Sequence, residues 1–125
     1  MTAVLERQDR RVVCERCLLA EAPFARMRGL LGRDRLERGE GLLLRPASSI
    51  HTFFMRFPID AVWLDRNLLV VGVTHDIAPW RTAAQRGARA VLELPAGEAA
   101  VLGLEPGEKL ILSRPAEPVP AAHAA

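Results

Sequence analysis

One apolar stretch, Ile50 to Asp65, constrains the fold more than any other part of the chain. It is rich in aliphatic and aromatic residues, yet it carries an imidazole, a thioether and two carboxylates, on His51, Met55, Asp60 and Asp65. Polar groups in such a run must find hydrogen-bond partners or serve a function, because burying them without partners costs free energy. We therefore expect this stretch to supply a core strand and the floor of a pocket.

The second half of the stretch predicts a β-hairpin. Ile59 to Leu64 is apolar on both strand faces, as in a strand that is covered on both sides. A tight turn is expected next, because Asp65 can bond to nearby backbone N–H groups and Asn67 tolerates the left-handed backbone. The Val-rich segment 68–74 then returns, so segments 59–65 and 68–74 should pair antiparallel.

Two helices and a long loop are expected elsewhere. An amphipathic helix is predicted over residues 23–32, because Pro23 suits a first helical turn and apolar residues follow at helical spacing. A shorter helix is predicted over residues 96–102, where Gly103 ends it. Residues 77–87 form a loop of about ten residues, a length that favours a functional role. Further strands are predicted at residues 11–14, 17–20, 42–44, 89–94 and 109–112.

Length and composition predict one folded domain. The 125 residues are half hydrophobic and about a quarter charged, which suits a single compact core. We expect the domain at residues 11–114, with a flexible N-terminus at 1–10 and a flexible tail at 115–125.

Charge and hydropathy limit the expected partners. The 17 basic and 15 acidic residues do not cluster by sign, so nucleic acid is not expected as a partner. No apolar run is long enough for a secretory signal or a spanning helix, so we expect no membrane contact and a cytoplasmic location. The sequence predicts neither a particular cofactor nor an oligomeric state.

Three blocks of residues, taken together, resemble one known family. They are Arg28-Gly29-Leu30-Leu31-Gly32, then Phe54 to Asp60 leading to Trp63-Leu64-Asp65, and finally Val91 to Gly97. In this order they are similar to the DUF192 family, also called UPF0127, over roughly residues 11–112. The resemblance implies an α+β fold with a mostly antiparallel, barrel-like sheet, and it implies no established activity. With the helices predicted above, the expected fold class is a single α+β domain with one N-terminal amphipathic helix and a short second helix.

Two carboxylates in apolar strands are candidates for a ligand pocket. Asp60 must be paired or must accept backbone N–H bonds, so a structural clamp and a functional role both stay open. Glu93 interrupts the apolar run of residues 91–94, and Arg28 is its natural partner if it points inward, because a guanidinium can hold a carboxylate by two bonds. If strand alternation instead places Glu93 on the solvent face, it has no such role.

Three further side chains complete the candidate pocket. In an extended chain His51 and Met55 project to the same side, and an imidazole with a thioether suits soft metals, with Asp60 added for a harder ion. A structural imidazole and a core thioether are the simpler interpretation, and His51, Met55 and Asp60 stay candidate metal ligands beside it. Trp80, in the long loop, could stack on a sugar or an aromatic ring, or simply hold the loop in place.

Two other motifs give weak signals. Cys14 and Cys17 have the C-x-x-C spacing, but a structural zinc needs four ligands and no second pair exists. His75 and Asp76 are adjacent on a predicted strand, so their side chains should point to opposite faces rather than form an acid–base pair.

Three classes of function stay open. The first is a small binding module for a polar ligand or a metal ion, whose pocket is lined by Arg28, His51, Met55, Asp60, Trp80 and Glu93. The second is a hydrolase or lyase that uses Asp60 or Glu93 as a base with help from His51. The third is a protein-interaction domain, which predicts a contiguous exposed apolar patch.

Overall fold

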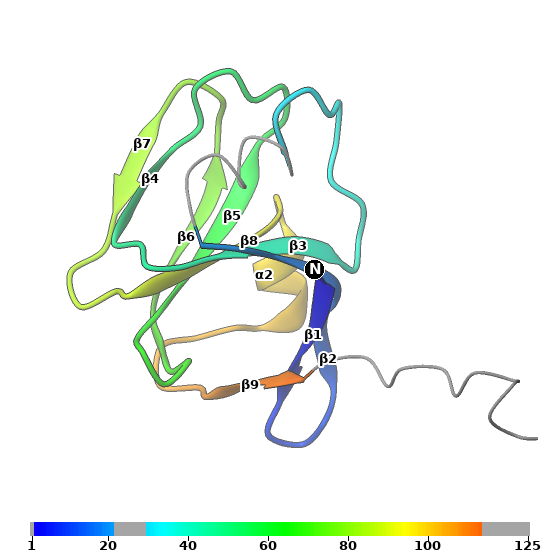
Figure 1. Cartoon of the computed structure of the whole chain (residues 1–125), viewed down its shortest axis with the longest axis vertical. Helices are drawn as coiled ribbons and strands as arrows, with labels where there is room; N and C mark the ends of the chain where they lie inside the picture. The colour runs from blue at the N-terminus through cyan, green and yellow to red at the C-terminus, as the bar shows by residue number, and fades with distance from the viewer. Residues whose placement is uncertain (1, 22–29, 114–125) are drawn as a thin grey trace, which may run out of the picture.

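The protein is described by a computed structural model over residues 2–21 and 30–113 (Figure 1). Nine strands and a short helix lie within these residues. In chain order they are β1 (Thr2–Arg7), β2 (Val12–Ala20), β3 (Glu40–Leu44), β4 (Ser49–His51), β5 (Ile59–Leu64), β6 (Val70–Ile77), β7 (Thr82–Ala84), β8 (Ala90–Pro95), α2 (Glu98–Leu102) and β9 (Leu110–Ser113).

Seven of the strands form one sheet in the order β6-β5-β8-β3-β2-β1-β9. Neighbouring strands in this sheet run antiparallel, except β2 and β3, which run parallel. The remaining strands, β4 and β7, form a separate antiparallel pair, seen at the upper left of Figure 1. β4 lies in the segment before the β5–β6 hairpin and β7 in the segment after it, so their pairing joins these two segments.

The predicted α+β, barrel-like fold class is wrong for the described residues, which are mostly β in an open sheet. No ladder joins the outer strands β6 and β9, and the residues just before them, Leu69 and Lys109, form an isolated bridge. The Val70 N–H donates to the Glu108 carbonyl at 2.8 Å, and the Val70 carbonyl accepts the Gly107 N–H at 2.8 Å. The turn before β9 therefore occupies the position where a closing ladder would continue.

Of the two predicted helices, the shorter one lies within the described residues. Residues 96–102, expected to be helical, contain α2, the one helix whose bounds lie within the described part of the chain; it ends at Gly103, in the left-handed backbone (φ 64°). The N-terminal amphipathic helix expected at 23–32 falls mostly on residues 22–29, outside the described residues. No helix within residues 2–21 and 30–113 is long and apolar enough to span a membrane.

The predicted hairpin is confirmed, since β5 and β6 pair antiparallel and every residue of β5 is buried. Asp65 fixes the turn: its Oδ1 accepts the N–H of Asn67 at 2.7 Å and of Leu69 at 3.0 Å. The left-handed residue is Leu68 (φ 65°) rather than Asn67. The two hydrogen bonds that Asp65 accepts hold this turn, although Leu68, a branched apolar residue, occupies the left-handed position.

Two segments predicted to be irregular are partly strand. Residues 1–10 are expected to be flexible, but Thr2–Arg7 form β1, which lies between β2 and β9 with Ala3 and Leu5 completely buried. The loop expected at 77–87 contains β7, which pairs with β4. In both cases a strand distant in sequence supplies the hydrogen bonds that make a short segment extended. The tail expected at 115–125 lies outside the described residues.

Each face of the sheet carries its own apolar cluster. One cluster includes Leu92 of β8 and Ala99 of α2, so it lies on the face that α2 covers. The other includes Ala61 and Trp63 of β5 and Val91 of β8. Side chains along a strand alternate between the two faces, and residues paired across neighbouring strands lie on the same face. The face on which a polar residue of β5 or β8 lies is therefore the face of the apolar cluster that contains its paired residue.

Candidate functional site

Asp60 is a completely buried structural clamp. Its Oδ1 accepts the N–H of Asp76 at 2.8 Å, and its Oδ2 accepts the N–H groups of Gly97 and Ala99, both at 3.0 Å. The Asp76 donor exists because β6 carries an extra residue opposite Asp60 and Asp76 adopts a left-handed backbone (φ 52°). One carboxylate thus joins β5, a bulge in β6 and the start of α2.

Glu93 lies on the other face of the sheet from Asp60. Glu93 pairs in register with Ala61 and Leu42, which belong to the cluster opposite α2, whereas Asp60 pairs with Leu94 on the α2 side. Glu93 is completely buried, so the prediction that it might face solvent is wrong. The predicted partner Arg28 lies outside the described residues. The two carboxylates proposed for a hydrolase or lyase do not share a cleft.

His51 and Met55 also separate. The chain turns after Thr52 and passes through a left-handed residue at Phe54 (φ 67°), so the extended spacing expected for residues 51–55 does not persist. Met55 packs in the buried cluster opposite α2, while His51 is exposed and its Nδ1 accepts the Phe53 N–H at 3.2 Å. No group of three or more His, Cys, Asp or Glu side chains suited to a metal occurs among the described residues.

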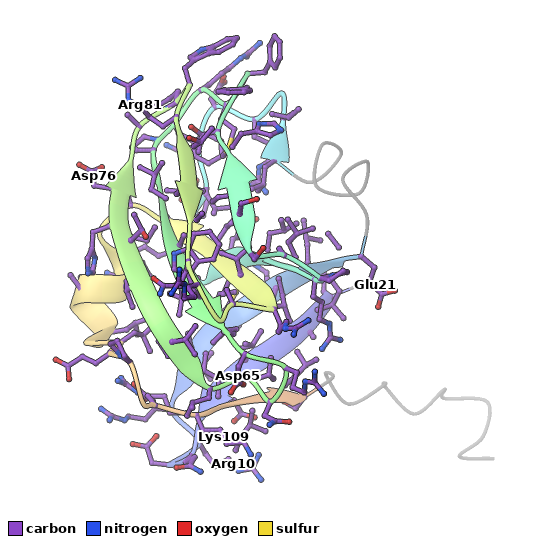
Figure 2. The ribbon with its side chains drawn as sticks, turned by 90° about the vertical axis from the view of Figure 1, so that its left-hand side faces the viewer. Arg10, Glu21, Asp65, Asp76, Arg81 and Lys109 are labelled. Carbon is purple, nitrogen blue, oxygen red and sulfur yellow. The ribbon has the colours of Figure 1, made fainter. Side chains whose placement is uncertain are left out.

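Exposed aromatic rings gather where these loops meet. We call Phe53, Phe54 and Trp80 the aromatic ridge; their exposed fractions are 36%, 67% and 54%. Phe53 stacks on His51 at 4.7 Å between ring centroids and on Trp80 at 5.9 Å, and Phe54 tilts against Trp80 at 4.7 Å. Figure 2 shows rings at the end of the molecule where Arg81 is labelled. The ridge is therefore a continuous exposed surface rather than a set of scattered side chains.

Buried Thr52 holds the two loops of the ridge together. Its Oγ1 donates to the Ala78 carbonyl at 2.7 Å and accepts the Arg81 N–H at 2.8 Å. Its own N–H donates to the Arg81 carbonyl at 2.8 Å, and its carbonyl accepts the Trp80 N–H at 3.0 Å. The residue between His51 and Phe53 thus fixes the loop that carries Trp80.

The ridge residues adopt unusual backbone conformations. Phe54 (φ 67°) and Trp80 (φ 65°) both occupy the left-handed region, which bulky side chains rarely adopt. Such conformations cost free energy and persist only where the surrounding structure holds them, and they concentrate at functional sites. Here the bonds of Thr52 hold them, and the result is to point two large rings into solvent.

Replacing Thr52 with Val should lower the free energy of unfolding by about 2 kcal/mol, because the part-buried bonds of its hydroxyl to the Arg81 N–H and the Ala78 carbonyl are both lost. Urea denaturation measures this change. The control is Thr82→Val, at an exposed threonine of β7, where we expect a change within about 0.5 kcal/mol. Equal changes in the two variants would show that Thr52 does not hold the loops.

The two cysteines are buried and free. An extra residue in β2 opposite β1 lets Cys14 pair with Leu5 and Cys17 with Ala3, so both thiols enter the cluster on the α2 side. The hydrogen bond with Cys14, and then burial, raise the pKa of Cys17 far above its ordinary value. A thiol held protonated in the core is a poor nucleophile, so Cys17 serves packing. Cys14 packs in the same buried cluster. Free cysteines do not test the predicted cytoplasmic location, which stays a prediction.

The ridge could be predicted from the sequence only in part. Trp80 is a candidate from its place in a loop, but Phe53, Phe54 and Thr52 were missing from the predicted site. The available signal is the adjacent pair Phe53-Phe54, because neighbouring residues in an extended chain point to opposite sides and cannot both enter one core. His75 and Asp76 are both exposed, and Asp76 contributes its backbone N–H to the Asp60 clamp.

Comparison with known proteins places the chain among uncharacterised relatives. The sequence model of the DUF192 family, described as "Uncharacterized ACR", matches residues 4–112. A UPF0127 protein of Pyrococcus abyssi (strain GE5 / Orsay) is 41% identical over 64 residues, which are 50% of this chain and 54% of that protein. A UPF0127 protein of Thermococcus sibiricus (strain DSM 12597 / MM 739) is 32% identical over 100 residues, 76% of this chain and 64% of that protein. The matches thus span between half and two thirds of these relatives.

Two crystal structures share the fold. One is a protein of unknown function from Novosphingobium aromaticivorans DSM 12444, with a TM-score of 0.74, 24% identity, and coverage of 89% of this chain and 84% of that one. The other is a protein from Sinorhizobium meliloti 1021 whose description suggests a transcription regulator, with a TM-score of 0.75, 22% identity, and coverage of 88% and 91%. At these identities the likeness shows the fold alone.

Proposed function

Because this chain belongs to the DUF192 family, whose description assigns no activity, we propose its function from its own surface: it is a small binding module that holds a polar ligand against the aromatic ridge. The observation that carries this proposal is that Phe53, Phe54 and Trp80 are exposed and in contact with one another. A soluble domain gains nothing for its own stability by keeping such rings in water, and exposed apolar patches commonly mark binding sites.

The ridge is rigid before any ligand arrives. Thr52 fixes both loops through four hydrogen bonds between 2.7 and 3.0 Å, and the antiparallel pair β4–β7 closes their base. A surface ordered in advance loses little conformational entropy on binding, so more of the contact free energy contributes to affinity. This order favours a dedicated binding surface over an incidental cluster of rings.

The ligand class that fits best is a neutral carbohydrate. A sugar ring has a flat apolar face that can stack on an indole, and its hydroxyl groups can bond to polar groups at the edge of the ridge. Two such groups are His51, stacked on Phe53, and the exposed guanidinium of Arg81. The positive charge of Arg81 disfavours cationic ligands. The alternative of a hydrolase or lyase that uses Asp60 or Glu93 as a base with help from His51 has no such support, because both carboxylates are completely buried whereas His51 is exposed.

Binding is tested with a panel of neutral oligosaccharides and the fluorescence of the two tryptophans. Trp63 is completely buried and its Nε1–H donates to Thr74 Oγ1 at 2.9 Å, so a ligand on the surface should change only the emission of Trp80. Calorimetry on the ligand that responds should then show an affinity at least about tenfold weaker for Trp80→Ala. The expected loss combines the stacking contribution with the apolar contact area that the substitution removes.

Val101→Ala provides the matched control. Val101 is 68% exposed on α2, away from the ridge, so this substitution also truncates an exposed apolar side chain. Its affinity should equal that of the parent. If no saccharide changes the Trp80 emission, or if Val101→Ala weakens binding as much as Trp80→Ala does, the carbohydrate proposal is rejected. A ridge that instead binds protein would favour the interaction-domain alternative.

A further inference from the structure

Three arginines lie together at one end of three neighbouring inner strands of the sheet. Arg45 directly follows β3, Arg66 lies in the turn after β5, and Arg89 directly precedes β8. The strands β5, β8 and β3 are neighbours, and β8 runs antiparallel to both of the others. The end of β3, the end of β5 and the start of β8 therefore lie side by side. Neighbouring strands are about 5 Å apart.

A cleft of about 480 Å³ lies at this end of the strands. All three arginines line it, with Glu21, Pro46, Asp65, Leu68 and Ala90. Figure 2 labels two of these lining residues, Glu21 and Asp65. The volume is within the range of roughly 300–1,000 Å³ found for small-molecule sites.

The guanidinium groups of these arginines have no acidic partner among the described residues. The ion pairs there involve other arginines, such as Arg7 with Glu108 and Arg33 with Glu40. The known bonds of Arg45 and Arg89 come from their backbone: the Arg45 N–H donates to the Ala20 carbonyl at 3.0 Å, and the Arg89 N–H to the Leu64 carbonyl at 2.8 Å. Three guanidinium cations at neighbouring strand ends repel one another, and an anion bound between them would offset this repulsion.

Two carboxylates also line the cleft, and they offset part of this charge. Asp65 is committed to its turn, where Oδ1 accepts two backbone N–H groups. Glu21 is exposed and forms no ion pair with a described residue. The three arginines still outnumber the two acids, so the lining keeps a net positive charge.

A second hollow, of about 700 Å³, adjoins the first, and Glu21, Pro46 and Arg89 line both of them. Ser48 and Ser49 contribute hydroxyl groups to its lining. A ligand that reached from one hollow into the other would meet guanidinium groups first and neutral hydrogen-bonding groups beyond them. This order suits an elongated molecule with an anionic end.

We propose that this arginine cleft, formed by Arg45, Arg66 and Arg89, binds a small polyanion that carries phosphate or carboxylate groups. A guanidinium presents two parallel N–H groups that match the oxygens of either group, and such charge-assisted bonds are the strong ones. The cleft is separate from the aromatic ridge, and this proposal does not depend on the function proposed for the ridge.

The test is calorimetric titration of the full chain at low ionic strength with pyrophosphate and, separately, with citrate. One saturable site is expected for at least one of them, and its affinity should fall on adding salt. Arg89→Gln and Arg45→Gln should each weaken binding about tenfold, as expected for loss of a charge-assisted contact. Arg66→Gln, in an exposed turn, provides a third variant if either of the others fails to fold.

Arg10→Gln is the control, because it removes the same charge from an exposed arginine, labelled at the bottom of Figure 2, that does not line the cleft. Its affinity should match the parent. Stronger binding of pyrophosphate assigns the cleft to phosphates, and stronger binding of citrate assigns it to carboxylates. Saturable binding of neither, or equal weakening by Arg10→Gln, overturns the proposal, since equal weakening would mean general attraction to a basic protein.

Discussion

The variant Asp60→Asn is expected to unfold more easily than the parent by about 2–4 kcal/mol, although it keeps nearly the same side-chain volume. The carboxylate accepts three backbone N–H bonds, and an amide has only one oxygen with which to accept them. At least one donor at Asp76, Gly97 or Ala99 would then face an NH₂ group in the protein interior. The whole junction of β5, β6 and α2 should weaken.

Urea denaturation followed by circular dichroism measures this loss. Asp76→Asn is the matched control, because it also converts a carboxylate to an amide within the same bulge, but Asp76 is exposed. Asn also tolerates the left-handed backbone found at that position. A change within about 0.5 kcal/mol is expected for the control. If the two variants were equally stable, Asp60 would not be a clamp and its carboxylate would be open to a functional role.

Gly41→Ala should lower the free energy of unfolding by about 1–3 kcal/mol, as overpacking in a core does. A methyl group at Gly41 of β3 would lie 2.8 Å from the Cys14 sulfur and 2.9 Å from the Glu93 carbonyl oxygen. The carbonyl belongs to the ladder between β3 and β8, so it can move only if two central strands move apart. The close approach therefore requires glycine for space rather than for backbone conformation.

Gly72→Ala separates this effect from the general cost of changing a strand glycine. Its added methyl group would meet only the side chain of Gln85, whose amide end can rotate away. We expect Gly72→Ala to change the free energy of unfolding by less than about 1 kcal/mol, since lower freedom in the unfolded chain offsets the small rearrangement. Thermal unfolding of both variants makes the comparison, and similar losses would contradict the packing argument at Gly41.

Local sequence patterns predicted the hairpin because everything that forms it lies within a short stretch. The apolar strand, the turn carboxylate of Asp65 and the returning Val-rich strand are consecutive, and the structure pairs them as β5 and β6. The short strands β1 and β7 were missed because their partners are remote. Extended structure in Thr2–Arg7 depends on β2 and β9, and in Thr82–Ala84 on β4, so neither segment shows its structure by composition alone.

The same distinction applies to the candidate site. The sequence shows that a carboxylate at Asp60 needs partners, but its donors depend on a bulge in β6 and on the start of α2, which no pattern near Asp60 contains. Likewise, Trp80 is predicted as a stacking residue, but its contact with Phe54 depends on left-handed residues in two separate loops. The residue types at Asp60 and Trp80 thus indicate that these side chains need partners, and the fold determines which partners they have.

The position of β1 has a consequence for how the chain is made. Among the strands of this sheet β1 is synthesised before the others, yet it lies between β2 and β9, and β9 is the last of these strands to be synthesised. A nascent chain can form the β1–β2 hairpin early, but the far edge of β1 stays unpaired until residues 110–113 emerge. We expect this edge to be the part of the newborn protein most open to chaperones or to unwanted pairing with another chain.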